Sequence, residues 1–184
     1  MEIRGERVTL RRVEPGDAPR LATILALPDV ARWWPAFDLA RVRAEFLVEQ
    51  PDYVAYAIVV DGGVVGLIQT NEEQDPEFRH ATIDLFLDPA VHGQGLGPEA
   101  IRALIGHLIE VNGHHRVTID PAAANVRAIR AYEKVGFRSV GILRQYQRFP
   151  DGTWQDALLM DLLADDLQGE GPPTPATDRP IEST

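Results

Sequence analysis

The sequence predicts an α/β fold: a mixed sheet of about seven strands with about four helices on its faces. Stretches of alternating or continuous apolar residues recur along the chain, and turn residues bound each of them. Segments with apolar residues at helical spacing lie between these stretches. One such segment is long enough to connect two parallel strands, which explains why the sheet is expected to be mixed.

The first half of the chain predicts both strands and helices. Alternation favours strands, helical apolar spacing favours helices, and Gly, Pro and Asp mark the turns. The expected elements, in order, are a strand at 7–13, a helix within 14–30, a loop at 31–38, a helix at 39–50 capped by Asp38, a hairpin of 53–60 and 64–70, an acidic loop at 71–79 and a strand at 80–87.

The second half begins with a glycine-rich turn, "HGQGLG", that runs into a helix. Pro98 suits the first helical position because its missing N–H costs nothing there. The elements expected beyond the turn are that helix, a strand at 115–120, a helix at 125–136 closed by Gly136, and a hairpin of 138–149 and 153–163. We therefore expect one domain at 1–168, followed by a Pro/Gly/Thr-rich tail at 169–184.

Composition narrows the classes of function. The net charge of −10 argues against nucleic acid as a partner and permits a cationic small molecule, although such a charge also serves solubility alone. The absence of cysteine excludes disulfides, a cysteine nucleophile and zinc–thiolate sites. The five histidines lack a metal-ligand spacing, so no metal is expected. No apolar stretch resembles a membrane span or a secretory signal, which favours a cytoplasmic protein without a membrane partner. A monomer and a homodimer both remain open.

The turn at 92–97 predicts an anion site. Its glycines permit positive φ and close approach, and the following helix adds unpaired N–H groups. A P-loop would need a lysine after the glycines, and none follows. Gly95, Gly97 and Ala100 match G-x-G-x-x-A, but "DPAVHGQ" separates them from the strand and repeated βαβ units are missing. The third candidate is the pyrophosphate of coenzyme A.

The strand "TIDLFL", the turn, its helix, "VTID" and "NVRAIRAYEKVGF" together resemble the core of the GNAT superfamily of N-acetyltransferases. The resemblance spans about 8–163 and is strongest at 80–137. The family's turn is usually [QR]-x-x-G-x-[GA], and His92 departs from it at the first position. With "ARWWPAFD" included, the motifs are similar to those of aminoglycoside 6′-N-acetyltransferases. The resemblance implies a mostly antiparallel, GNAT-like sheet and acetyl-CoA as co-substrate.

The same resemblance implies a coenzyme site built from the turn, the strand before it and the helix at 125–136. The backbone of the strand would meet the pantetheine arm, and Asn125 would contact the coenzyme as well as cap its helix. The residues implied are Leu85, Leu87, His92, Gly93, Gln94, Gly95, Leu96, Gly97, Asn125, Ala128 and Tyr132.

Acetyl transfer requires a neutral amine, and a nearby carboxylate can hold the ammonium and take its proton, directly or through water. Asp84 lies in the middle of a strand, where an unpaired charge is expensive to bury, and Asp120 ends the neighbouring strand. The alternatives are a solvated face for Asp84 and a turn cap for Asp120. The resemblance gives Tyr132 the role of general acid toward the coenzyme A thiolate; a core tyrosine is the alternative.

The acceptor side carries weaker signals. Trp33 and Trp34 would stack on a sugar or wall the acceptor site, unless they pack against the sheet. Glu72 and Glu73 would meet a polycation, unless their loop is merely solvated. We therefore expect direct acetyl transfer to a primary amine, with an aminoglycoside as the leading acceptor. A protein N-terminus, a polyamine, a siderophore amine and a non-catalytic acyl-CoA sensor remain as alternatives.

Overall fold

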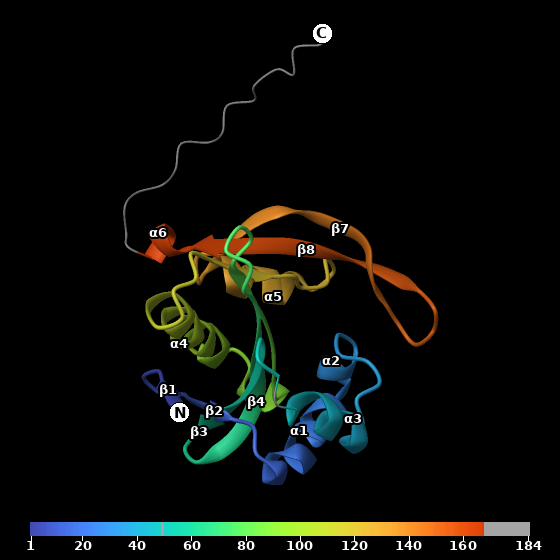
Figure 1. Cartoon of the computed structure of the whole chain (residues 1–184). Coiled ribbons are helices and arrows are strands. Elements are labelled where there is room, and N and C mark those ends of the chain that lie inside the picture. Colours follow the sequence, from blue (N-terminus) through green and yellow to red (C-terminus); the bar gives the residue numbers. More distant parts are fainter. Residues whose placement is uncertain (49, 168–184) are drawn as a thin grey trace.

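A computed structural model describes residues 1–48 and 50–167, so the predicted tail at 169–184 lies outside the described residues. Its strands form one sheet in the order β1-β2-β3-β4-β5-β6-β8-β7 (Figure 1). The strands are β1 (Glu2–Arg4), β2 (Thr9–Arg12), β3 (Tyr53–Val60), β4 (Gly63–Glu73), β5 (His80–Leu87), β6 (Arg116–Ile119), β7 (Arg138–Arg148) and β8 (Trp154–Leu163).

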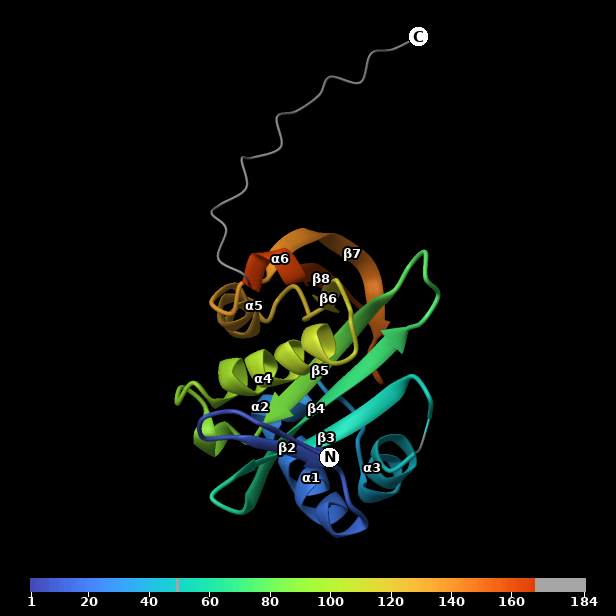
Figure 2. The same cartoon turned by 60° about the vertical axis from the view of Figure 1, so that its left-hand side comes forward.

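Helices cover both faces of this sheet (Figure 2). One face packs against α4 and α5, and the other against α1, α2 and α3. Alternation along β3 explains the division, because Tyr56 and Ile58 enter the first core while Ala55 enters the second. The helices are η1 (Pro15–Asp17), α1 (Ala18–Leu25), α2 (Pro28–Ala31), α3 (Leu39–Phe46), η2 (Pro89–Val91), α4 (Leu96–Glu110), α5 (Val126–Glu133) and α6 (Ala164–Leu167).

The parallel pair β5–β6 is short and opens into a gap. It is registered only at Ala81↔Val117 and Thr82↔Thr118, whereas every other pair in the sheet of the described residues is antiparallel. Beyond Thr82, β5 runs on to Leu87 while β6 ends at Ile119. The two strands therefore separate in the middle of the sheet.

The predicted elements are present, with local differences. The parallel pair and both hairpins are confirmed, and β1 is a strand that the sequence pattern did not predict. The helix predicted within 14–30 is confirmed as α1, but it ends at Leu25: Leu27 is extended before Pro28, which begins the short, unpredicted helix α2. The helix α4 begins at Leu96, so Pro98 is its third residue, where an N–H would also lack an intrahelical acceptor.

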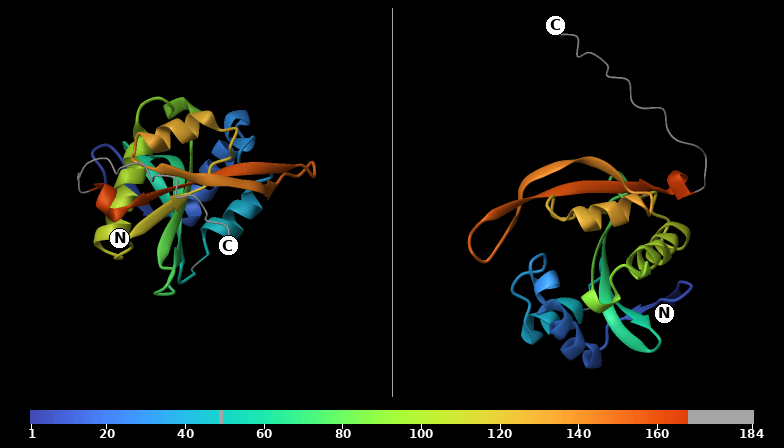
Figure 3. Two further views of the ribbon diagram at one scale, coloured as in Figure 1. Left: turned by 90° about the horizontal axis from the view of Figure 1, so that it is seen from above. Right: turned by 180° about the vertical axis from the view of Figure 1, so that it is seen from behind.

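Two ends of elements also differ. The helix α3 stops at Phe46 rather than at residue 50. The strand β4 extends through Glu73, so Glu72 and Glu73 belong to a strand and not to the acidic loop. The long β7–β8 hairpin forms the edge of the sheet beyond β6, and its tip projects past the body of the domain (Figure 3). Among residues 1–48 and 50–167, no helix has both the length and the apolarity to cross a membrane.

Candidate active site

The glycine turn is an open cradle of backbone donors. Gly93 has φ 78° and Gly95 has φ 80°, a left-handed conformation that glycine adopts without strain. Gly95 also caps α4. Within the described part of the chain, the N–H groups of residues 93–97 have no hydrogen-bond acceptor. Five free N–H groups at the positive end of a 15-residue helix suit a phosphate, so the cradle fits the pyrophosphate of a coenzyme.

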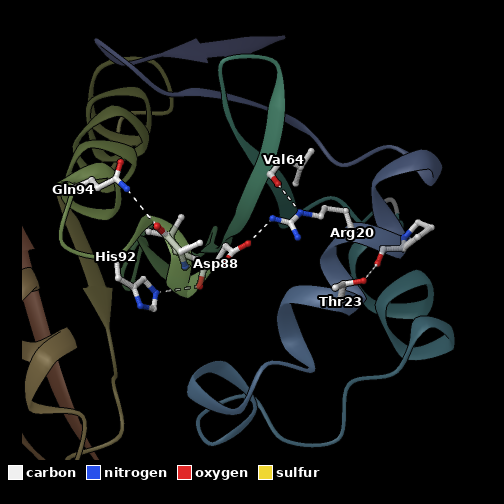
Figure 4. Close-up of polar contacts among 9 residues, drawn as sticks. Arg20, Thr23, Val64, Asp88, His92 and Gln94 are labelled. Carbon is white, nitrogen blue, oxygen red and sulfur yellow. Dashed lines mark hydrogen bonds and ion pairs between the residues drawn. The ribbon is translucent and has the colours of Figure 1, made fainter.

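The segment before the turn is anchored to the sheet and to α1 (Figure 4). Asp88 accepts a hydrogen bond from the Ala90 N–H at 2.8 Å and pairs with the Arg20 guanidinium at 2.5 Å. The Ala90 bond, opposed by burial and assisted by Arg20, lowers the pKa of Asp88. Arg20 also donates to the Val64 carbonyl at 3.1 Å, which joins α1 to β4 at this point. The exit from β5 is therefore rigid.

His92 has a structural role at the position where the family motif usually has Gln or Arg. Its Nε2 lies 3.2 Å from the Leu87 carbonyl oxygen, at the end of β5 (Figure 4). Burial, with a contribution from Arg127, lowers the pKa of His92, which favours a neutral imidazole that donates this bond. The side chain therefore ties the turn to the strand while the turn's N–H groups stay free.

Arg7 holds the turn from the other side. Its Nη1 donates to the Gln94 carbonyl at 3.0 Å, and its Nε donates to Glu99 Oε2 at 2.9 Å. The backbone N–H of Val8 also donates to Glu99, at 3.0 Å. The first turn of α4 is thus fastened to the N-terminal strands, so the cradle is preformed.

A cavity of about 810 Å³ lies where β5 and β6 separate. Its walls come from the loop at 33–37, from α3, from β5, from the segment at 120–122 and from the β7–β8 hairpin. Asp84 alternates with Ile83 and Leu85 along β5, and therefore points to the side of the sheet covered by α1, α2 and α3. Tyr132 comes from α5, on the other side, and lines the same cavity. The gap between the strands thus joins the two faces.

Asp84 is the most perturbed carboxylate of the site. Burial, and then the charge of Asp120, raise its pKa to about 7, against the lowering effect of a 2.8 Å hydrogen bond from the Leu85 N–H. Neither Asp84 nor Asp120 forms an ion pair with a cation of the described residues. The cavity therefore contains two carboxylates whose charges a cationic ligand would neutralise.

Asp120 has one side-chain partner. The Tyr146 hydroxyl donates to its Oδ2 at 2.9 Å. Burial raises the pKa of Asp120, and the Tyr146 bond opposes that rise. Burial and Asp120 together raise the pKa of Tyr146 to about 12, so the phenol keeps its proton. No local sequence signal distinguishes Tyr146, because only the fold brings this part of β7 to the end of β6.

Tyr132 and Asn125 lie as the sequence predicts, on one side of α5. Tyr132 is only 8% exposed and lines the cavity, and burial, then Asp84, then Asp120 raise its pKa strongly. Asn125 lines the cavity as well, and its Oδ1 accepts the Ala128 N–H at 3.3 Å as the helix cap. Ala128 contributes that N–H and is not part of the cavity wall.

Trp33 and Trp34 both line the cavity, but only Trp34 is also part of the aromatic core. Both rings line the cavity, and Trp34 also packs edge-on against Phe86, with ring centroids 5.2 Å apart. Trp34 is therefore a wall of the cavity and part of the aromatic core at once. Trp33 is stacked by the Arg32 guanidinium, 4.6 Å from its ring centroid.

Glu72 and Glu73 are not brought to the cavity. Glu72 accepts from Asn112 Nδ2 at 3.0 Å and contacts His114 Nε2 at 2.5 Å, and neither glutamate lines the cavity wall. The cavity instead contains a pair that the motifs did not single out, Arg41 and Glu45 of α3, whose side chains meet at 2.6 Å. Among the described residues, no cluster of three or more His, Cys, Asp or Glu side chains could hold a metal ion.

Comparison with known proteins agrees with this geometry. Residues 7–138 match the Acetyltransferase (GNAT) domain. An aminoglycoside N(6′)-acetyltransferase type 1 of Klebsiella pneumoniae is 31% identical over 166 residues, 80% of each chain. A spermine/spermidine N(1)-acetyltransferase of Bacillus subtilis is 32% identical over 85 residues, which are 46% of this chain and 56% of that one. The crystal structure of AAC(6′)-Ib with coenzyme A and kanamycin superimposes with a TM-score of 0.73 at 28% identity, over 88% of this chain and 97% of that one.

Proposed function

The chain belongs to the GNAT family of acetyltransferases, and from that premise we propose that it acetylates a primary amine of a cationic small molecule, the 6′-amine of an aminoglycoside being the leading candidate. The observation that carries the proposal is the pair Asp84 and Asp120, two carboxylates without a cationic partner among the described residues, in a cavity at the gap between β5 and β6. An ammonium group is the ligand that such a site favours.

Acetyl-CoA, when bound, supplies the acetyl group as a thioester. The N–H groups of residues 93–97 would hold its pyrophosphate, because they are aligned at the start of α4 and have no acceptor of their own among the described residues. Asn125 lines the cavity and caps α5, and it would contact the coenzyme there. The Leu85 N–H, expected to meet the pantetheine arm, is engaged by Asp84 and would have to be shared.

Asp84 is proposed as the base. With a pKa near 7 it is about half ionised at neutral pH, which suits a group that must take a proton during turnover. Asp120 would hold the ammonium while Asp84 accepts its proton, directly or through one water. The freed amine nitrogen forms the new bond to the acetyl carbon as the carbon–sulfur bond breaks. The transfer is direct, since the chain has no cysteine and the cavity wall contains no serine.

Tyr132 is proposed to return a proton to the leaving sulfur. Burial and the two carboxylates raise its pKa, so it keeps its proton in the free enzyme. A bound ammonium would offset one of the two negative charges, which lowers the cost of giving that proton up. The Tyr132 phenol is therefore a suitable acid when the acceptor amine is bound, and it keeps its proton when no acceptor is present.

Two features favour an aminoglycoside as the acceptor. The relative from K. pneumoniae, which is named an aminoglycoside N(6′)-acetyltransferase, matches this chain over 80% of its length. AAC(6′)-Ib, which has a similar fold, was crystallised with coenzyme A and kanamycin. The cavity is large and has aromatic walls, Trp33 and Trp34, beside the acidic pair, as a sugar ring with ammonium groups requires. Such an activity would confer aminoglycoside resistance.

The test is thiol release from acetyl-CoA with a panel of amines: kanamycin and other aminoglycosides, spermidine, a peptide with a free N-terminus, and a neutral primary amine. The proposal expects turnover of aminoglycosides at the highest kcat/KM, with one acetyl group per molecule at the 6′-nitrogen by NMR. Efficient acetylation of the neutral peptide without turnover of any aminoglycoside would overturn the choice of acceptor.

A polyamine is the second candidate. The uncompensated acidic pair would also hold a linear polycation, and a relative over less than half of the chain is named for spermine and spermidine. Spermidine makes no use of an aromatic wall for a sugar ring. Replacing Trp33 by Ala should therefore raise the KM for kanamycin more than the KM for spermidine, which could lose only a cation–π contact, and this difference separates the two acceptors.

A further inference from the structure

The Tyr146 hydroxyl forms a hydrogen bond inside the cavity, whereas the ring of this residue contributes little to the core. The side chain is 52% exposed, and its oxygen lies 2.9 Å from Asp120 Oδ2. An exposed aromatic ring adds little to fold stability, so the position is explained by what the hydroxyl holds. Asp120 has no other side-chain hydrogen bond among the described residues.

A deformation of β7 presents this hydroxyl. Between the pairs Leu143↔Ala157 and Gln147↔Gln155, β7 advances four residues while β8 advances two, so β7 bulges. Gln145, inside the bulge, has φ 49°, a left-handed conformation that is strained for a residue with a side chain. The Gln145 N–H donates to Asp156 Oδ1 at 2.7 Å, which stabilises the bulge from the facing strand.

The segment that carries Asp120 is tied to the same part of β8. The Leu158 N–H donates to the Pro121 carbonyl at 2.9 Å, and the Ala123 N–H donates to the Asp156 carbonyl at 2.9 Å. Asp156 therefore contacts both partners: its backbone holds the segment after Asp120, and its side chain holds the bulge beside Tyr146. The distance between Tyr146 and Asp120 is thus set by backbone bonds and not by two free side chains.

From this geometry we infer that Tyr146 is a positioning residue for the acceptor amine: its hydroxyl fixes the Asp120 carboxylate opposite Asp84, so that Asp120 anchors the ammonium and Asp84 is left to accept the proton. The inference rests on the proposed function for its kinetic consequences. The hydroxyl also favours the ionised form of Asp120, because a donated hydrogen bond stabilises a carboxylate.

The charged groups around Asp120 come from several elements. Asp84 faces it from β5, Tyr132 from α5, and Tyr146 and Arg148 from β7. Arg41 and Glu45 of α3 reach the cavity as a pair. Among these groups, only Tyr146 forms a side-chain hydrogen bond with Asp120, so removing its hydroxyl perturbs Asp120 directly.

The first experiment needs no activity. Carboxyl carbon NMR titration of the full chain, wild type against Tyr146→Phe, should show a higher pKa for Asp120 in the variant. The ring remains half exposed and one hydrogen bond is lost, so the melting temperature should fall by only a few degrees and the variant should stay folded. An unchanged pKa of Asp120 would overturn the inference, whether or not the protein acetylates amines.

Kinetics give the second measurement. In Tyr146→Phe the KM for kanamycin should rise about tenfold, the order expected for losing a hydrogen bond to a charged group, while kcat and the affinity for acetyl-CoA stay close to wild type. The acid limb of the kcat/KM profile should move to higher pH, because a proton can then reside on Asp120. A loss confined to kcat would contradict an anchoring role. If the wild type acetylates none of the amines, the proposed function fails and the titration still decides the role of Tyr146.

Matched variants test the bulge. Asp156→Ala removes the acceptor of the Gln145 N–H and should reproduce the rise in KM, whereas Asp156→Asn keeps an oxygen at that position and should resemble wild type. Trp154→Phe alters another exposed aromatic residue of the hairpin, outside the cavity wall, and should change neither KM nor pKa. Equal effects of Asp156→Ala and Asp156→Asn would contradict the bulge as the device that presents Tyr146.

Discussion

The proposed coenzyme cradle and the proposed acceptor cavity are built in different ways. The cradle is a continuous stretch, residues 93–97, that offers backbone N–H groups and adopts left-handed conformations with glycine. The cavity is assembled from segments far apart in the chain and offers side chains. A site made of backbone leaves a glycine pattern in the sequence, whereas a site made of side chains from several elements leaves no contiguous pattern.

The two regions also differ in where strain is stored. The described residues contain three non-glycine residues with positive φ: Ala36, Asp61 and Gln145. Asp61 lies in the β3–β4 turn, but Ala36 lines the acceptor cavity and Gln145 precedes Tyr146. Strained backbone persists where the surroundings hold it in place. We therefore expect changes on the acceptor side to act through geometry, and changes in the cradle to act through access to the backbone.

The largest difference between the two sides should come from Asp84→Asn. The substitution keeps the shape of the side chain but removes the base, so kcat/KM for kanamycin should fall about 10²–10⁴-fold. The dissociation constant of acetyl-CoA, measured by calorimetry, should stay within about twofold of wild type, because the cradle is untouched. In the wild type, kcat/KM should rise with pH through about 7 as Asp84 ionises. Full activity of the variant would place the base elsewhere.

Tyr132→Phe tests the residue that comes from the coenzyme face and lines the acceptor cavity. The ring and its packing against Phe137 remain, so only the proton donor is lost. We expect kcat to fall about 10²-fold, at the lower end of general acid catalysis, with KM for acetyl-CoA nearly unchanged. An acetyl thioester of a more acidic thiol needs less help from a proton donor, so steady-state kinetics with such a donor should show a smaller loss in kcat. Wild-type kcat in the variant would mean that water protonates the thiolate.

Gly95→Val breaks the cradle alone. Gly95 has φ 80°, where a β-branched residue is strained, and an added Cβ would lie 3.4 Å from Arg7 Nη2 beside the turn. The dissociation constant of acetyl-CoA should rise about tenfold or more, for a strain of about 1–2 kcal/mol and a blocked approach. Gly62→Val is the matched control, since Gly62 has φ 76° in the β3–β4 turn and carries the same strain away from the site. Equal weakening by both variants would show a general loss of fold.

The two substitutions should have opposite effects on thermal stability: Asp84→Asn should stabilise the protein at pH 8, and Gly95→Val should destabilise it. The pKa of Asp84 is raised to about 7 by folding, so its contribution to stability is fully present below about pH 4 and is lost as pH rises through 7. Asp84→Asn should therefore melt about 3 °C or more above wild type at pH 8, and the difference should vanish near pH 4. Gly95→Val should melt below wild type at both pH values. A destabilised Asp84→Asn at pH 8 would mean that the carboxylate is not strained in the free protein.

The fold and the backbone geometry of the glycine turn could be predicted from the sequence for a physical reason. Apolar periodicity records which face of each strand and helix is buried, and the glycines record positive φ, so the strand at 80–87 and the turn that follows it could be placed. The placement of Glu72 could not be inferred, because a loop and the end of a long strand have the same acidic composition, and its partners Asn112 and His114 are distant in the chain.

The roles of Tyr146 and Arg41 could not be predicted from the sequence for a related reason. Each acts through contacts made by its neighbours in space: Tyr146 through a bulge that depends on Asp156, and Arg41 through a loop it holds from the next helix. Composition and periodicity carry no information about such contacts. The carboxylates were easier to find, since a charge in the middle of an apolar strand is itself a signal, as at Asp84.

The smallest effect we expect is from Arg41→Lys, on the acceptor loop. Arg41 Nη1 donates to the carbonyls of Pro35 and Ala36, both at 3.3 Å, and its guanidinium stacks 4.0 Å from the centroid of the Phe37 ring. Lysine keeps the charge but cannot bond both carbonyls in one plane. The loop around the strained Ala36 should loosen, and the KM for kanamycin should rise about threefold, with kcat and acetyl-CoA binding unchanged.

The control for Arg41→Lys is Arg43→Lys on the same helix. Arg43 is exposed and has no hydrogen bond to a described residue, so its replacement should leave every kinetic constant at the wild-type value. A rise in the KM for acetyl-CoA in Arg41→Lys would contradict the division drawn here, because the loop would then also shape the coenzyme side. An unchanged KM for kanamycin would mean that the packing of Phe37 against Trp34 and Phe46 holds the loop without the guanidinium. The first result would make the loop part of both sites, and the second would leave the loop on the acceptor side but held by aromatic packing.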